Sequence, residues 1–285
     1  PGTETCLKIS GEVRATVYWV SDNSLDLSDG TGDDFTSELR ARVAFDAKND
    51  SEIGTIGSHI RFRGYGYNDN ANTDGVAQLD QGYITVGGFK VGYFWTWWDD
   101  VGLTGENDAF ANTTRFNEAN YAYSTDAFTI GLAVDDLSPF YNGNEVGLQG
   151  YASASLGVAN ISVWGVYDFG VDEGAIVGEV SAAVGPGTFE LYGGWASGPS
   201  VYVTQSEWTV GAAYSFKATD RLTITPQVNY WSDVGFVAGV DAWGAGLLAE
   251  YQLATGLVAS ATVDYYDQDL VDDQWSGFVR LTRSF

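Results

Sequence analysis

The arginines of this 285-residue chain are concentrated near its beginning. Five of the nine occur within its first 63 residues, four of them as two pairs at alternate positions: Arg14, Arg40, Arg42, Arg61 and Arg63. Residues two apart in an extended strand point to the same side, and paired strands lie about 4.8 Å apart. If these segments pair, the guanidinium groups form one basic patch on a polar wall. We expect nearby carboxylates to neutralise part of it: Glu12, Glu38 and Asp46.

Acidic residues gather in a later stretch, residues 97–116, which contains Asp99, Asp100, Glu106 and Asp108. Gly102 and Gly105 permit sharp turns there. The same stretch holds aromatic residues that argue against a fully solvated loop: Trp97, Trp98, Phe110 and Phe116. Carboxylates and guanidinium groups placed opposite one another would create an electric field that orients polar molecules.

Residue types that perform catalysis or bind metals are scarce. His59 is the sole histidine and Cys6 the sole cysteine, so neither a zinc site nor a Ser/His/Asp triad can be assembled. Carboxylate pairs are common in any chain with 38 acidic residues, so they do not by themselves indicate glycosidase chemistry. We therefore expect no catalytic site, no resident metal and no cofactor.

The composition restricts the class of protein further. With 38 acidic and 13 basic residues the formal charge is −25, which excludes unaided nucleic-acid binding. Only 18% of residues are charged, 15% are aromatic and 36 are glycine. The aromatic content excludes disorder, and the charged fraction is below that of ordinary soluble domains. The longest charge-free stretch, 146–167, is interrupted by polar residues and glycines, so we predict no membrane-spanning helix.

Hydrophobicity alternates with a period of two along the whole chain. Between Leu7 and Val20, odd positions are mostly apolar and even positions mostly polar, as in a strand with two different environments. Sixteen segments show this alternation: 7–20, 35–48, 55–67, 77–86, 89–96, 117–124, 128–135, 146–156, 159–169, 175–184, 188–196, 206–217, 221–231, 241–252, 257–266 and 274–285. The alternation is weakest at 77–86 and 117–124. The prediction is an all-β, antiparallel structure.

The connections between these segments alternate between long and short. Long acidic loops such as 22–34 and 97–116 follow odd-numbered segments, and short turns such as 87–88 follow even-numbered ones. Aromatic residues mark both ends of the apolar faces, for example Trp19 and Trp208 at one end and Phe89 at the other. This pattern is typical of a transmembrane antiparallel β-barrel with short periplasmic turns and long extracellular loops. Sixteen strands would leave a water-filled lumen.

Two terminal motifs resemble the alphaproteobacterial outer-membrane porin family. They are Pro1-Gly2-Thr3-Glu4-Thr5-Cys6-Leu7-Lys8-Ile9-Ser10-Gly11 and the closing Trp275-Ser276-Gly277-Phe278-Val279-Arg280 with Arg283-Ser284-Phe285; weaker likeness occurs at Gly87-Gly88-Phe89-Lys90-Val91-Gly92 and Glu250-Tyr251-Gln252. The resemblance implies a homotrimeric sixteen-stranded barrel, one domain over 1–285, with an inward-folded constriction loop at about 97–116. The opening residues lack a leader pattern, which indicates a removed signal peptide or a fragment.

Taken together, these features predict a general diffusion channel of the bacterial outer membrane that passes small hydrophilic solutes and ions. Its acidic loops favour a preference for cations and weak divalent-cation bridges to lipopolysaccharide. One alternative is a sugar-selective channel, with lumen aromatics as a sliding track: Tyr18, Tyr65, Tyr67, Phe94, Trp164, Tyr192 and Trp231. A second alternative is a secreted β-sandwich that binds carbohydrate.

Overall fold

The described part of the chain is almost entirely β-strand. The structure, a computed structural model, describes residues 5–21, 35–67, 76–106 and 108–285. Its strands are β1 (Cys6–Val20), β2 (Phe35–Ser51), β3 (Gly54–Tyr67), β4 (Gln78–Val86), β5 (Phe89–Trp95), β6 (Arg115–Ser124), β7 (Phe128–Asp136), β8 (Val146–Ser155), β9 (Ala159–Asp168), β10 (Glu173–Val184), β11 (Gly187–Ala196), β12 (Ser206–Lys217), β13 (Leu222–Val234), β14 (Ala242–Ala254), β15 (Leu257–Gln268) and β16 (Gln274–Ser284). Two 3-10 turns, η1 (Trp97–Asp100) and η2 (Ser138–Phe140), follow β5 and β7.

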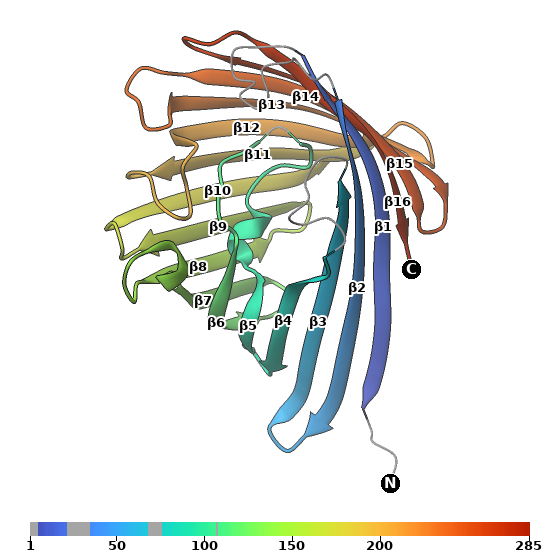
Figure 1. Cartoon of the computed structure of the whole chain (residues 1–285), viewed down its shortest axis with the longest axis vertical. Coiled ribbons are helices and arrows are strands. Elements are labelled where there is room, and N and C mark those ends of the chain that lie inside the picture. Colours follow the sequence, from blue (N-terminus) through green and yellow to red (C-terminus); the bar gives the residue numbers. More distant parts are fainter. Residues whose placement is uncertain (1–4, 22–34, 68–75, 107) are drawn as a thin grey trace.

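These strands form one closed antiparallel barrel (Figure 1). Each strand pairs with its neighbours in the chain, and β1 closes the ring by pairing with both β2 and β16. Val13 of β1, for example, lies opposite Ala41 on one side and Arg283 on the other. Tight turns join the hairpins at one end; Gly87 and Gly185 adopt positive φ angles of 56° and 57° there, which glycine tolerates without steric cost.

The alternation of side chains is reversed relative to that of a water-soluble barrel. On β7, Ile130, Leu132 and Val134 point outward and are 55%, 73% and 48% exposed. Between them, the inward-facing Ala133 and Asp135 are 3% and 0% exposed. An apolar exterior around a polar interior is the arrangement that a lipid bilayer requires. None of the helices in the described ranges is long and apolar enough to cross a membrane.

Aromatic side chains border the apolar exterior at both ends. At the long-loop end, the ring of Tyr265 packs against those of Trp243 and Trp275, with centroids 5.1 and 4.9 Å away. At the short-turn end, Tyr214 stacks on Phe216 at 5.6 Å. Such rings occupy the two membrane–water interfaces of outer-membrane barrels.

The structure confirms the sixteen predicted strands and the closed transmembrane barrel. All predicted segments correspond to strands, with ends that differ by a few residues; the segment predicted at 221–231 continues to Val234 as β13. The β-sandwich alternative is wrong, because the sheet closes on itself instead of splitting into two layers. The acidic loop at 22–34 and residues 68–75 lie outside the described residues.

Candidate functional site

A carboxylate on β1 gathers the first group of arginines. Glu12 accepts a hydrogen bond from Nε of Arg40 at 3.0 Å and forms a second, shorter contact with Nη2 of the same guanidinium. Arg42 Nη1 lies 3.8 Å and Arg14 Nε 4.0 Å from the same Glu12 oxygen. The register explains this convergence, because Arg14 lies opposite Arg40, and Glu12 lies opposite Arg42, across the β1–β2 pair.

Asp80 on β4 gathers the second group. Its carboxylate lies 2.6 Å from Arg61 Nε, 3.2 Å from Arg42 Nε, 3.2 Å from Arg63 Nη1 and 2.7 Å from Arg115 Nη1. The Asp80 side chain is 0% exposed. A carboxylate can be buried in this way only because the surrounding cations compensate for lost hydration.

A β-bulge directs Asp80 toward the arginines. Between β3 and β4 the register passes from Arg61 opposite Gln81 to Phe62 opposite Leu79, so Asp80 is left without a partner in the ladder. Such an extra residue locally changes the side to which a side chain points. Beside it, Arg115 also donates to the backbone oxygen of Asp80 at 3.3 Å.

The structure therefore brings Arg14, Arg40, Arg42, Arg61 and Arg63 together on adjacent strands. We call these five, with Arg115, Glu12 and Asp80, the arginine wall. Sequence reasoning missed Asp80, because the bulge breaks the alternation in one of the two weakest segments. It missed Arg115 because this residue was placed in the loop 97–116, whereas it begins β6. Of the expected carboxylate partners, Glu12 pairs as anticipated, whereas Asp46 pairs with His59 at 2.7 Å.

The connection between β5 and β6, residues 96–114, folds into the barrel (Figure 1); we call it the constriction loop. Side-chain hydrogen bonds from three directions attach it to the rest of the interior. Trp98 Nε1 donates to the Tyr202 oxygen at 3.0 Å, the Tyr192 hydroxyl to the Asp108 oxygen at 3.0 Å, and Trp231 Nε1 to the Ala109 oxygen at 2.6 Å.

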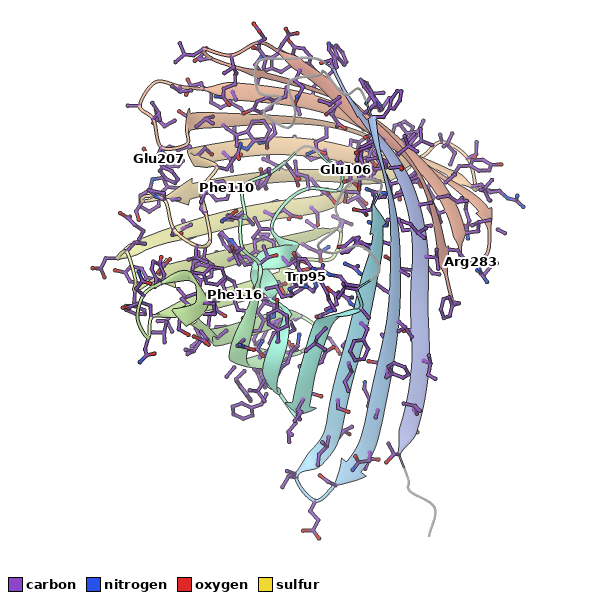
Figure 2. All side chains as sticks on the ribbon, viewed as in Figure 1. Trp95, Glu106, Phe110, Phe116, Glu207 and Arg283 are labelled. Carbon is purple, nitrogen blue, oxygen red and sulfur yellow. The ribbon has the colours of Figure 1, made fainter. Side chains whose placement is uncertain are left out.

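Apolar burial fixes the same loop. Trp98, Leu103 and Phe110 are at most 8% exposed and belong to one cluster that includes lumen-facing residues of β9 to β12. Figure 2 shows Phe110 and Phe116 within the outline of the barrel. A fully buried aromatic side chain contributes a few kcal/mol, so this loop is a packed element and not a solvated one.

A second inward loop supports the constriction loop. Residues 197–205, between β11 and β12, form the brace loop, whose Val203 makes a β-bridge with Ala111. Asn112 N donates to the Tyr202 oxygen at 2.7 Å. The Tyr202 hydroxyl donates in turn to the buried carboxylate of Asp135 on β7. Tyr202 thus connects the barrel wall to the constriction loop; the sequence offered no signal for this role.

The four acidic residues predicted in the constriction loop lie in different surroundings. Asp99 accepts a hydrogen bond from the Thr114 hydroxyl at 2.7 Å, and Asp100 is its neighbour on η1. Glu106 pairs with Nη1 of Arg280 on β16 at 3.3 Å, and the loop therefore reaches the last strand. Arg280 is a further basic residue that sequence reasoning missed.

Asp108 differs from the other three because it turns back into the loop. Its carboxylate accepts a hydrogen bond from the backbone N–H of Leu103. Burial raises the pKa of Asp108 to about 6, with smaller contributions from the negative charges of Glu106 and Glu190 and an opposing one from the Leu103 N–H. Glu190 on β11 accepts hydrogen bonds from Thr104, at 2.7 Å from both its N–H and its hydroxyl.

The aromatic residues proposed as a sugar track are mostly covered. Phe94, Trp164, Tyr192 and Trp231 are between 1% and 4% exposed; Trp164 and Tyr192 belong to the buried cluster, and Trp231 donates to the constriction loop. They face the lumen as predicted, but their rings cannot stack on a passing sugar. Tyr18 and Tyr65 are half-buried, and the side chain of Tyr67 lies outside the described part of the structure.

A closed barrel with an apolar exterior, two aromatic rims and a charged interior crossed by an inward loop defines a membrane channel of the porin type. The chain belongs to the porin family, since residues 1–280 match the model of the Porin subfamily. It is 43% identical over 293 residues to the outer membrane protein y4fJ of Sinorhizobium fredii, covering 100% of this chain and 85% of the relative. It is 36% identical over 303 residues to outer membrane protein IIIA of Rhizobium leguminosarum bv. viciae, covering 98% and 80%.

Solved structures agree on the fold. A variant of Rhodopseudomonas blastica porin superposes with a TM-score of 0.72 at 17% identity, covering 98% of this chain and 100% of the other. The protein is thus a non-enzymatic porin channel of the bacterial outer membrane, as the sequence predicted.

Proposed function

We propose that this channel passes small hydrophilic solutes and ions by passive diffusion, with a preference for cations. The observation that carries the proposal is the opposition of the arginine wall to Asp99 of the constriction loop. Burial raises the pKa of Asp99, while the guanidinium groups of Arg42, Arg61 and Arg115 oppose the shift. Because these groups interact without direct contact, a field extends across the space between wall and loop.

The cation preference rests on the balance of charge outside the wall. The chain carries a formal charge of −25, although the wall itself is basic. Acidic groups at a channel entrance raise the local concentration of cations. The wall then acts mainly on orientation, because a polar solute aligns its dipole with the field between arginines and carboxylates.

Reversal potentials measured across a tenfold KCl gradient in a planar bilayer test this function. We expect an open, ohmic channel whose zero-current potential has the sign of K⁺ preference. Solute flux that rises linearly with concentration supports general diffusion. A Cl⁻-preferring potential would contradict the selectivity, and absence of conductance would contradict the channel itself.

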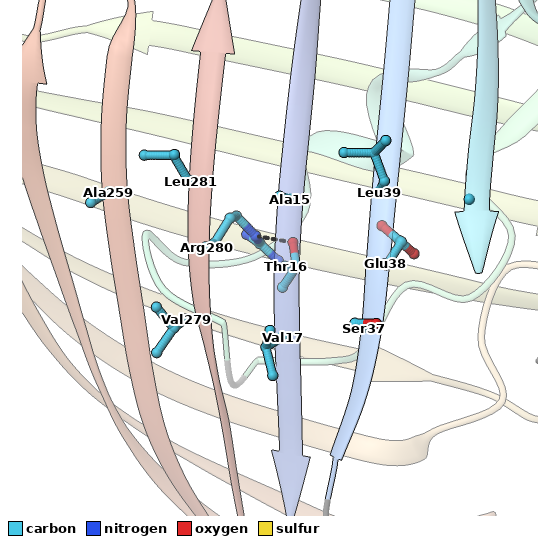
Figure 3. A pocket seen from close by; sticks show the side chains of 11 residues that line it. Ala15, Thr16, Val17, Ser37, Glu38, Leu39, Ala259, Val279, Arg280 and Leu281 are labelled. Atoms are coloured by element: carbon cyan, nitrogen blue, oxygen red, sulfur yellow. Dashed lines mark hydrogen bonds between the residues drawn. The ribbon is translucent and has the colours of Figure 1, made fainter. Parts of the chain in front are cut away.

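We also propose that the barrel assembles as a homotrimer through its β15–β16–β1–β2 face. A shallow depression of about 670 Å³ lies on the outside of these strands (Figure 3). Besides Thr16, Glu38, Gly66 and Arg280, its lining consists of small or apolar outward-facing side chains that permit close approach of a second barrel: Ala15, Val17, Ser37, Leu39, Ala259, Val279 and Leu281. Mass measurement by light scattering in detergent tests the assembly, and a single-barrel mass would contradict it.

Lipopolysaccharide is the proposed partner at the long-loop end. Carboxylates occur there beside the aromatic rim; Trp243 Nε1, for instance, donates to Asp267 at 3.1 Å. Divalent cations can bridge such carboxylates to phosphate groups. The described residues contain no group of three or more potential metal ligands, so we expect bridging to be weak and chelator-sensitive.

A further inference from the structure

We propose that a recess beneath η1 binds small zwitterionic solutes, of the class of free amino acids, as they cross the channel. This inference rests on the proposed diffusion function and adds a solute class to it. The recess carries opposite charges on its two sides. The solute that satisfies both is one that bears both an ammonium and a carboxylate group.

The recess lies between the constriction loop and the lumen face of β4 to β6. Its volume is about 480 Å³, and its polar lining comprises Thr85, Lys90, Thr96, Asp99, Asp100, Asn120 and Ser124. Gly87 and Gly88 of the β4–β5 turn also line it, so it reaches the short-turn end of the barrel. A solute that has passed the arginine wall from the long-loop side meets this recess next.

Lys90 supplies the positive side. Its Nζ lies 3.6 Å from the ring centroid of Phe94 and 4.3 Å from that of Tyr83. Two aromatic faces therefore hold the ammonium in place by cation–π attraction. Among the described residues, no carboxylate oxygen lies within 4.0 Å of it, so its charge is available to an anionic group of a solute.

Asp99 and Asp100 supply the negative side from η1. This turn is fixed by its N-cap, where Thr96 Oγ1 accepts a hydrogen bond from Trp98 N at 3.2 Å. Asp99 uses one oxygen to accept from Thr114, which leaves the other for a solute. Within the described ranges, no cationic group lies within 4.0 Å of Asp100.

The two sides are close enough to interact. Burial and the charge of Asp99 raise the pKa of Asp100, and the ammonium of Lys90 acts against this shift. Opposite charges that sense each other across a solvent-accessible recess form a fixed dipole. A simple anion would be attracted by Lys90 but repelled by both aspartates, and a simple cation would be attracted by the aspartates but repelled by Lys90. A neutral sugar carries no charge to pair with either side.

Current recordings with added solutes test the proposal on the full channel. L-Glutamine is the zwitterionic probe and L-arabinose the neutral one, each titrated in 0.1 M KCl. We expect saturable reduction of the KCl current by glutamine and a weaker, non-saturating effect of arabinose. Equal effects of the two probes would overturn the inference. Loss of the KCl current itself would instead overturn the proposed channel function, so the two failures are distinguishable.

Matched variants locate the effect. Lys90→Gln and Asp100→Asn each remove one charge of the recess and should raise the half-blocking concentration of glutamine about fivefold, as expected for one partly exposed ion pair. Lys8→Gln makes the same charge change on β1, opposite Asp46 and outside the recess. This control variant should leave the half-blocking concentration of glutamine unchanged. A half-blocking concentration in Lys90→Gln equal to that of the unmodified channel would overturn the inference.

Discussion

Replacing Asp80 by asparagine would separate the charge of the arginine wall from its shape. The side chain keeps its size and one acceptor oxygen, but the only carboxylate within 4.0 Å of Arg61, Arg63 and Arg115, among the described residues, loses its charge. Arg42 retains the more distant Glu12 at 3.8 Å. We therefore expect the wall to become more basic without a change in the barrel.

The magnitude follows from the composition of the wall. Six arginines share two carboxylates, which gives a formal charge of +4, and the substitution raises it to +5. One extra charge about 7 Å from a passing ion changes its energy by about 0.6 kcal/mol in water. Screening at 0.1 M salt roughly halves this value. Because cations and anions are affected in opposite directions, the cation-to-anion permeability ratio should fall about threefold.

The assay is the reversal potential of Asp80→Asn and the unmodified channel in the same KCl gradient. The double variant Asp80→Asn with Arg115→Gln restores the charge of the wall and should return the ratio close to its original value. Breaking a buried ion pair costs about 3–5 kcal/mol, so each variant must be checked for folding. Resistance of the barrel to SDS at room temperature shows that it is folded. A folded Asp80→Asn channel with an unchanged reversal potential would refute the reasoning.

Three further predictions concern the loops. Lowering the pH from 7.5 to 5 protonates Asp108, whose pKa is raised to about 6, so cation preference should decrease with falling pH. In Asp108→Asn, the part of the pH-dependent change in reversal potential that is due to Asp108 should be missing. Glu106→Gln removes the ion pair with β16, and noise in the open-channel current should increase as the loop tip gains freedom; unchanged noise would show that packing alone fixes it. Tyr202→Phe leaves the buried carboxylate of Asp135 without its hydroxyl donor at a cost of about 1–3 kcal/mol; heat-induced unfolding should start at a lower temperature, whereas Tyr214→Phe at an exposed hydroxyl should have little effect.

The strands could be predicted from the sequence because each environment is imposed on every second residue. Lipid on one side and water or a packed loop on the other leave a strong alternation, which is clear in β1 and β7. The same rule placed Arg40 and Arg42, and Arg61 and Arg63, on one face. It was weakest at 117–124 and at 77–86, where the bulge at Asp80 interrupts the period of two.

Long-range contacts of the interior were beyond prediction from local pattern. Arg280 approaches the constriction loop only because β16 closes the ring against β1. Trp164 and Tyr192 carry the alternation of lumen-facing residues, but whether a loop covers them depends on contacts far away in the chain. Tyr202 lies in a loop without periodicity, so its position between Asp135 and Trp98 became visible only in three dimensions.

The constriction and brace loops pack against one half of the interior, from β8 to β13, and the arginines occupy the other half. The route for solutes is consequently an off-axis slit between the arginine wall and the packed loops, and not a round tube centred in the barrel. In a slit, the smallest dimension of a molecule decides passage. Flat or elongated molecules should therefore cross faster than spherical ones of equal mass. Adding strands to the barrel would widen the slit far less than the increase in barrel circumference suggests.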